Sequence, residues 1–485
     1  MMPGPNLPSA SPALTALPAR EAVRLLRRRE VSPLELIDAA LARIAEVDPL
    51  VNAVPTLCAD RARERARRME GTAPPEDQGG WLAGLPVLIK DLVEVAGVRT
   101  THGSPIFADH VPEVSAYEVE RIESKGGIVL GKTNTPEFGA GANTFNEVFG
   151  ATRNPWSTAL TCGGSSGGSA VALATGMAWL ADGSDLGGSL RTPAAFCSVV
   201  GLRPSPGRVP RGPASLPFAT LSVEGPMARD VRDVALFLDA MAGFDPRDPL
   251  SYDPPAVPYA EAALRPMPLA RVAFSPDLGG ITPVDPEVAG LCRQAAGRFA
   301  QLGAVVEEAS PDLGTAVEVF RVLRAAQFAG NMAPLLAEHR DRLKPEVVWN
   351  IEHGMRLDAD EIGRAERERG LLQRRTVEFL GHYDLLLCPA AVVPPFPVET
   401  RYLEELNGHR FPSYIDWVAI NYAITLTGCP ALSLPCGFTA GGLPVGVQLV
   451  GPPRGEAKLL AAAAVLENAL GIANSVPIDP RTAAA

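Results

Sequence analysis

The sequence predicts an α/β fold, a single large domain in which a mixed β-sheet is sandwiched between α-helices. From Trp81 onward, short apolar runs alternate with segments of helical periodicity, the pattern of a sheet covered by helices. No internal repeat or long linker divides the chain, and large α/β enzymes reach its 485 residues as one unit. The expected strands are 85–89, 128–130, 179–181, 271–274, 305–308, 385–388, 431–434 and 445–450, and the expected helices include 115–124, 231–241 and 286–302.

The N-terminal segment is predicted to be helical after a disordered tail at 1–15, which is rich in Pro, Ala and Ser. Ser32 is a candidate N-cap, Pro33 fits the first helical position and Glu35 completes a capping box. We expect Asp48 and Pro49 to end this helix, since proline breaks a helical interior.

The remaining boundaries follow from composition. An arginine-rich helix is expected at 61–70, so that N-terminal helices fill 16–70, and the polar stretch 71–80 separates them from the strands. The folded domain is expected to span 16–475, with a C-terminal tail at 476–485. Residues 252–384 are poorer in motifs and more helical, which predicts a helical insertion that shapes the substrate site.

Composition argues against several classes of function. The formal net charge of −11 disfavours a nucleic-acid partner. No secretory signal and no apolar run long enough for a bilayer is present, so we expect a cytoplasmic protein without a membrane partner. The 7 cysteines form no C-x-x-C pair, and none of the 6 histidines pairs with another at metal-ligand spacing. We therefore expect no metal and no cofactor.

Two glycine-rich loops and one lysine carry the chemistry. Ser165 lies in the first loop and Ser189 in the second, and Lys90 ends an apolar run. Burial can lower the pKa of a lysine until its neutral amine accepts a proton. One serine can then relay a proton between the lysine and a second, nucleophilic serine, and the glycines allow backbone N–H groups to approach an oxyanion. This set can hydrolyse an amide without histidine.

Extended motifs around these residues resemble the amidase signature family. They lie at 84–91, 133–138, 154–156, 163–169, 187–194, 200–204, 430–437 and 443–448. The resemblance covers most of the chain and implies one α/β domain with a mixed sheet and no metal or organic cofactor.

The resemblance also implies a role for each matched residue. Ser189 matches the nucleophile that forms an acyl-enzyme, Ser165 the bridging serine that often follows a cis peptide bond, and Lys90 the base. Ser166 matches an auxiliary hydroxyl that orients the lysine. The oxyanion hole is expected in the backbone of Leu186, Gly187, Gly188 and Ser189.

Other residues near the motifs have less specific roles. We expect Phe138, Gly139, Asn143 and Gly164 to contact the substrate. Further pocket walls are expected from 252–384 and 396–417. Ser184 stands where threonine is common in the family and keeps the hydroxyl, whereas His102 replaces a smaller residue at a position that could face the pocket. Asp185 is read as a loop anchor and Arg191 as structural.

Two motifs have competing interpretations. The Gly-Gly-Ser-Ser-Gly-Gly stretch from Gly163 could be a flexible linker, but an apolar helical pattern follows it at once. Residues 126–133 fit the phosphate-loop pattern G-x-x-x-x-G-K-T, but a helical pattern precedes them, 128–130 are strand-like, and Pro136 breaks any helix that follows.

Three functions therefore stand side by side. The first is an amidase that hydrolyses the C–N bond of a small, apolar or aryl carboxamide to a carboxylic acid and ammonia or an amine. The second is the glutaminase A subunit of a tRNA-dependent amidotransferase, which needs partner subunits. The apolar and aromatic segment 414–422 favours the first over the second. The third is nucleotide binding at 126–133. The oligomeric state stays open, with a homodimer common among proteins that resemble this one.

Overall fold

The structure is a computed structural model that describes residues 11–70 and 79–482. Most of the predicted N-terminal tail, the greater part of the separator 71–80, and the last three residues lie outside the described residues. Within the described ranges, no helix has both the length and the apolar character that a membrane span requires.

An 11-stranded mixed sheet forms the centre of the molecule, in the order β1-β3-β2-β8-β10-β9-β16-β17-β13-β11-β12. Parallel pairs join β2 to β3 and β8, and β11 to β12 and β13, and the other neighbours are antiparallel. Its strands are β1 (Thr56–Leu57), β2 (Pro86–Lys90), β3 (Ile128–Thr133), β8 (Leu180–Asp185), β9 (Val200–Arg203), β10 (Val223–Ala228), β11 (Arg271–Phe274), β12 (Val305–Glu308), β13 (Leu385–Pro389), β16 (Ala431–Phe438) and β17 (Pro444–Val450). The predicted mixed sheet is confirmed.

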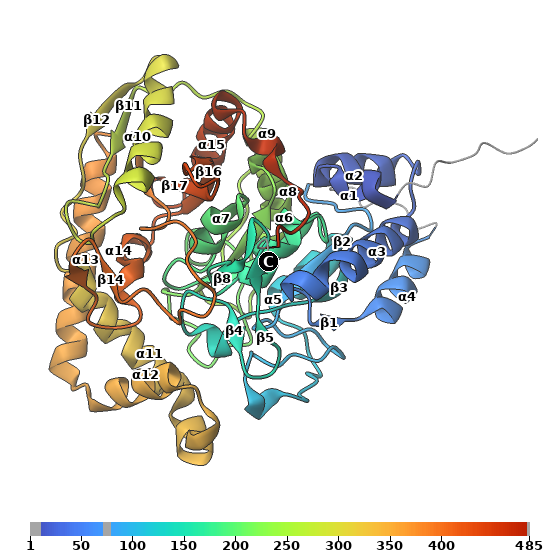
Figure 1. Cartoon of the computed structure of the whole chain (residues 1–485), viewed down its shortest axis with the longest axis horizontal. Helices are drawn as coiled ribbons and strands as arrows, with labels where there is room; N and C mark the ends of the chain where they lie inside the picture. The colour runs from blue at the N-terminus through green and yellow to red at the C-terminus, as the bar shows by residue number, and fades with distance from the viewer. Residues whose placement is uncertain (1–10, 71–78, 483–485) are drawn as a thin grey trace, which may run out of the picture.

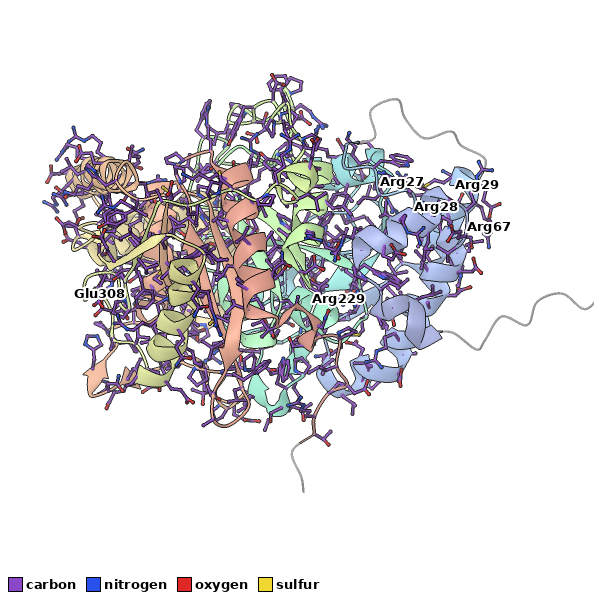
Figure 2. All side chains as sticks on the ribbon, turned by 90° about the horizontal axis from the view of Figure 1, so that it is seen from above. Arg27, Arg28, Arg29, Arg67, Arg229 and Glu308 are labelled. Carbon is purple, nitrogen blue, oxygen red and sulfur yellow. The ribbon has the colours of Figure 1, made fainter. Side chains whose placement is uncertain are left out.

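Three short hairpins lie outside this sheet. They are β4 (Phe145–Asn146) with β5 (Gly150–Ala151), β6 (Arg153–Asn154) with β7 (Ser157–Thr161), and β14 (Glu405–Leu406) with β15 (His409–Arg410). The sheet sets the long dimension of the molecule. In Figure 2, Glu308 of β12 lies toward one end and Arg27, Arg28 and Arg29 lie toward the other.

Helices flank the sheet, as Figure 1 shows. They are α1 (Ser11–Ala16), α2 (Ala19–Arg27), α3 (Pro33–Val51), α4 (Ala59–Met69), α5 (Tyr117–Ser124), α6 (Gly167–Ala174), α7 (Arg191–Cys197), α8 (Val231–Met241), α9 (Tyr259–Ala262), α10 (Pro286–Gln301), α11 (Ala316–His339), α12 (Pro345–Arg356), α13 (Ala359–Leu380), α14 (Ala419–Thr427) and α15 (Glu456–Leu470). Helix α15 packs on α8 and α10, and all three contact the sheet. The main apolar core lies beneath them, and a second cluster surrounds α14.

Helix α3 confirms the predicted capping box but not its predicted end. Ser32 Oγ accepts from the Glu35 N–H, and the Glu35 carboxylate accepts from the Ser32 N–H. The helix passes through Pro49 to Val51. The prediction that Pro49 ends it is wrong by two residues: the helix ends at Val51, where Asn52 adopts the left-handed conformation that commonly follows a helix. Directly after the helix, Asp48 Oδ1 accepts from the N–H groups of Ala53 at 2.6 Å and Val54 at 3.1 Å, which fixes the chain as it leaves the helix.

The structure describes part of each predicted tail, and residues 11–15 of the N-terminal one are helical where disorder was expected. Residues 11–16 form helix α1. The guanidinium of Arg229, which is labelled in Figure 2, donates to the Thr15 carbonyl at 2.7 Å. At the other end, the Ile478 N–H donates to the Ala174 carbonyl at 2.9 Å, and the Arg481 guanidinium lies 4.6 Å from the Trp156 ring centre. These backbone and ring contacts fix both segments on the domain.

The segment 252–384 also differs from a purely helical insertion. It contains α9 to α13, but it also supplies β11 and β12, which extend the central sheet to one edge. Helices α11 and α12 pack against each other and lie at the lower left of Figure 1. Helix α11 matters for function because its Phe320, Arg324 and Phe328 line the cavity described below.

Candidate active site

Lys90 is the buried centre of the site. It is the last residue of β2, whose five residues are all buried, and its own side chain has no solvent exposure. Its Nζ lies 2.7 Å from Ser165 Oγ, 2.9 Å from Ser166 Oγ and 2.9 Å from Ser184 Oγ. Three hydroxyl oxygens therefore match the three N–H donors of an ammonium group.

The site stabilises the neutral form of the Lys90 amine, relative to its charged form, more than bulk water does. Complete burial lowers the pKa of Lys90 to about 8, because burial penalises the charged form. The carboxylates of Glu224, Asp182 and Asp185 act in the opposite direction and limit the fall. A lysine with this pKa has an appreciable neutral fraction near neutral pH and can serve as a general base.

The first serine loop is fixed by close packing. The Gly164–Ser165 peptide bond is cis, as the resemblance implies, and α6 begins directly after Ser166. A Cβ at Gly167 would lie 2.2 Å from Thr144 Oγ1, so only glycine allows this approach. Helix α6 is buried along its whole length, which rules out a flexible linker here.

The second serine loop joins β8 to α7 and is held by Asp185. Its carboxylate accepts from the Gly188 N–H at 2.9 Å, the Leu190 N–H at 3.2 Å and the Arg191 guanidinium at 2.8 Å. Burial alone would raise the pKa of Asp185, but Arg191 and Arg203 hold it well below its usual range. The anchor role of Asp185 and the structural role of Arg191, which is itself fully buried, agree with the sequence interpretation.

Ser189 belongs to the second serine loop and lines the cavity. Its carbonyl accepts from the Ser166 N–H at 3.1 Å, which ties the loops together, and its side chain lines the same cavity as Ser165 and Ser184. Among described residues, the N–H groups of Leu186, Gly187 and Ser189 meet no hydrogen-bond acceptor, whereas the Gly188 N–H is committed to Asp185. Three of the four N–H groups expected to form an oxyanion hole are therefore without an acceptor among the described residues.

The cavity has an inner and an outer part. The inner cavity, of about 100 Å³, ends on the serines and is walled mainly by apolar and aromatic groups. Its lining includes Leu92, Phe138, Gly139, Leu186, Phe320, Arg324, Phe328, Tyr414, Ile415 and Val418. The outer cavity, of about 430 Å³, extends to Glu94, His102 and Phe107. The residues that line both cavities are Leu92, Phe138, Ser184, Leu186, Ser222 and Phe328.

Two of the four predicted substrate contacts line this cavity and two lie behind it. Phe138 and Gly139 are on the wall. Asn143 is buried and its amide donates to the carbonyls of Thr400 and Arg401, so that it positions a loop. Gly164 packs against the Asn143 backbone. Neither belongs to the cavity lining.

Sequence reasoning missed several residues of the site. In the sequence, Ser184 is only a departure from the family pattern. In the structure its hydroxyl accepts a hydrogen bond from Lys90 Nζ, and the retained hydroxyl was the one signal in the sequence that could have indicated this contact. Arg324 of α11 lines the inner cavity, where it donates to the Tyr414 hydroxyl at 2.7 Å and to the Asn350 side chain. No short motif marks Arg324, because its neighbours come from segments far away in the chain. His102 does face the outer cavity, as its position had suggested.

The phosphate-loop pattern at 126–133 does not form a phosphate loop. Gly131 and Lys132 lie within strand β3. Lys132 has no solvent exposure, and its Nζ donates to the Val93 carbonyl and, at 3.0 Å, to Thr100 Oγ1. A lysine held in this way cannot reach a phosphate, which removes the structural basis for nucleotide binding.

Known proteins resemble the chain over almost its full length. A family model described as Amidase matches residues 35–460. An acylamidase of Rhodococcus erythropolis is 35% identical, covering 96% of this chain and 97% of that protein. The glutamyl-tRNA(Gln) amidotransferase A subunit of Moorella thermoacetica is 37% identical, covering 93% of this chain and 96% of that protein. A solved bacterial aryl acylamidase of the amidase signature family superposes with a TM-score of 0.88 at 29% identity, covering 96% and 99%.

Proposed function

The chain belongs to the amidase signature family of hydrolases, and on that premise we propose that it hydrolyses a small, apolar or aryl carboxamide through an acyl-enzyme on Ser189. The observation that carries the proposal is the wall of the inner cavity. Next to the serines it presents Leu92, Phe138, Phe320 and Val418, which favour an apolar acyl or aryl group by burying its surface.

The proposed reaction begins with proton transfer. Ser189 Oγ attacks the amide carbonyl carbon while its proton passes to Ser165 Oγ, and the Ser165 proton passes to the neutral Lys90 amine. The N–H groups of Leu186, Gly187 and Ser189 stabilise the oxyanion of the tetrahedral intermediate. Reversal of the relay then protonates the amide nitrogen, the C–N bond breaks, and ammonia or an amine leaves.

Hydrolysis of the acyl-enzyme repeats these steps with water. Water attacks the ester carbonyl, its proton passes through the same relay to Lys90, and the Ser189–acyl bond breaks as Ser189 recovers a proton. The product is a carboxylic acid. The geometry that supports this relay is the 2.7 Å hydrogen bond between Lys90 Nζ and Ser165 Oγ, because a proton can pass directly between two hydrogen-bonded atoms.

The glutaminase of a tRNA-dependent amidotransferase remains a second candidate, because such A subunits are as similar to the chain as the acylamidase is. One feature of the cavity favours it. Arg324 is 4% exposed and lines the inner cavity, and no described carboxylate forms an ion pair with it. Its guanidinium could pair with a substrate carboxylate such as that of glutamine.

Two measurements test these proposals. Intact-mass spectrometry after treatment with a fluorophosphonate should show one adduct that maps to Ser189, absent in Ser189→Ala and formed slowly in Lys90→Ala. An adduct on another residue would refute the assigned nucleophile. Turnover of anilides and benzamides by the purified chain should exceed turnover of glutamine; the reverse, or glutaminase activity that requires added partner subunits, would favour the second candidate.

A further inference from the structure

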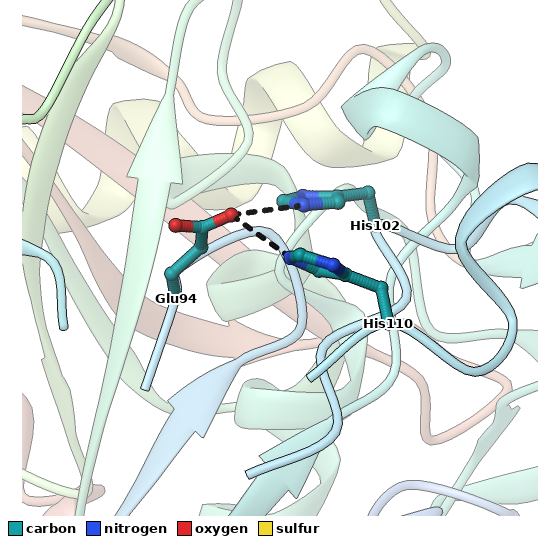
Figure 3. Close-up of side chains that lie close together, drawn as sticks. All are labelled: Glu94, His102 and His110. Carbon is teal, nitrogen blue, oxygen red and sulfur yellow. Dashed lines mark hydrogen bonds and ion pairs between the residues drawn. The ribbon is translucent and has the colours of Figure 1, made fainter. Parts of the chain in front are cut away.

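Three potential metal ligands meet beside the outer cavity, and two of them line it. They are Glu94, His102 and His110, and one donor atom from each lies within 4.8 Å of the other two. Figure 3 shows one carboxylate oxygen of Glu94 facing the nitrogen-bearing edges of both imidazole rings. That oxygen lies 3.7 Å from His102 Nε2 and 3.3 Å from His110 Nε2.

These distances suit a small tetrahedral metal centre. Two ligands that each lie about 2.0–2.1 Å from a tetrahedral Zn²⁺ are separated by about 3.3 Å. The Glu94–His110 distance of 3.3 Å equals this spacing, and the Glu94–His102 distance of 3.7 Å is slightly longer. Two histidines and one glutamate also make up a common ligand set of zinc sites that keep a fourth position open.

The ligands are held before any metal binds. The segment that carries them is cross-linked by its backbone: the Thr100 N–H donates to the His110 carbonyl at 3.0 Å, and the Phe138 N–H donates to the His102 carbonyl at 2.8 Å. The Phe107 ring meets both imidazoles edge-on, with ring centres 5.3 Å and 5.7 Å away. Because backbone and rings are fixed, little ordering is needed when an ion enters.

We propose that Glu94, His102 and His110 form a binding site for a divalent transition-metal ion, with Zn²⁺ as the best fit. Glu94 and His102 line the outer cavity, so the open coordination position is reached by water or by a donor group of a molecule that enters the cavity. The site plays no part in the Ser189 chemistry proposed above and does not depend on it.

The test is metal binding by the full-length chain without a histidine tag. After chelator treatment and dialysis, titration calorimetry with Zn²⁺ should give one bound ion per chain, and Co²⁺ should develop visible d–d absorption. His110→Gln and Glu94→Gln should each weaken binding more than the roughly 10–100-fold that loss of an outer-shell partner causes. His382→Gln is the matched control, since His382 is exposed and outside the cluster, and it should bind as the wild type does.

The outcomes separate a metal site from a hydrogen-bonded cluster. Wild-type binding that is lost in both ligand variants and kept in the control supports the site. No binding of Zn²⁺ or Co²⁺ by the wild type would overturn it, as would binding that survives in both His110→Gln and Glu94→Gln. Circular dichroism of each variant shows that the fold is intact, and if one variant fails to fold, the other decides.

Discussion

The pH dependence of Ser189 reactivity tests whether the hydroxyls around Lys90 set its basicity. Ser184→Ala removes one of the three oxygens that accept from Lys90 Nζ, at 2.9 Å. A hydrogen bond to a charged group contributes about 1.5–3 kcal/mol. Since one pKa unit corresponds to about 1.36 kcal/mol, loss of this bond should lower the pKa of Lys90 by about 1–2 units.

The starting point is the pKa of about 8 that burial gives Lys90. Only the neutral amine accepts a proton, so reactivity should rise with pH through about 8 in the wild type, where roughly one-tenth of Lys90 is neutral at pH 7. In Ser184→Ala the midpoint should move down to about 6–7. The plateau above the midpoint should be lower, because a weaker base is a poorer proton acceptor.

The assay is the second-order rate of fluorophosphonate labelling of Ser189 at several pH values, which requires no knowledge of the substrate. Ser184→Thr is the control, because it keeps the hydroxyl and should keep the midpoint. A midpoint in Ser184→Ala that stays at the wild-type value, or an equal shift in Ser184→Thr, would refute the argument that the Ser184 hydroxyl stabilises the ammonium form.

Three further substitutions test the rest of the site. Ser189→Ala should lower kcat/KM by about 10⁴-fold or more, measured on whichever amide proves active, because no other group can form the acyl-enzyme. Asp185→Asn should lower the free energy of unfolding in urea by about 3–5 kcal/mol, since it leaves the buried Arg191 without its counter-charge. Gly188→Ala should slow labelling of Ser189 by about 5–150-fold, the factor that corresponds to the roughly 1–3 kcal/mol that such strain costs, because φ is +115° there and the new Cβ would lie 2.6 Å from Asn421 Cβ.

Matched controls for these substitutions lie far from the site. Glu308→Gln removes an exposed ion pair with Arg293 and should change the free energy of unfolding by at most about 1 kcal/mol. Gly290→Ala lies inside α10, where a new Cβ meets nothing within 4 Å, and it should stabilise the chain by about 0.5–1 kcal/mol. If Glu308→Gln had as large an effect as Asp185→Asn, or Gly290→Ala as large an effect as Gly188→Ala, the effects would reflect a general loss of stability. That result would contradict the site-specific reasons given above.

Much of the fold could be predicted because local patterns agreed with tertiary demands. Strands β11 and β12 and helix α8 lie at their predicted bounds, each a short apolar or amphipathic segment between turn residues. Strand β10 was missed because Gly225 and Pro226 lie in its interior, where local propensity opposes a strand and only the pairing with β8 and β9 imposes one.

The site shows the same division between local and distant determinants. Ser165, Ser189 and Lys90, the residues proposed for catalysis, belong to contiguous motifs and could be found by inspection. The Lys90–Ser184 contact and the approach of Glu94 to His102 and His110 depend on how separate strands and loops meet, so no spacing rule reports them. Arg324 reaches the cavity only because α11 packs against α14, far away in the chain.

Two buried lysines on neighbouring strands show why burial alone does not make a catalytic base. Burial lowers the pKa of Lys132 as well as that of Lys90. Lys132, however, donates to the Val93 carbonyl and lies 3.8 Å from the Asp91 carboxylate, and neither group has a proton to return. Its one hydroxyl partner, Thr100 Oγ1 at 3.0 Å, donates its own proton to the Val98 carbonyl. Among the described residues, the hydrogen-bond partners of Lys90 Nζ are all serine hydroxyls. A hydroxyl can accept a hydrogen bond from an ammonium group and donate one to a neutral amine. The proposed proton relay therefore depends on the kind of hydrogen-bond partner around the lysine more than on the depth of burial.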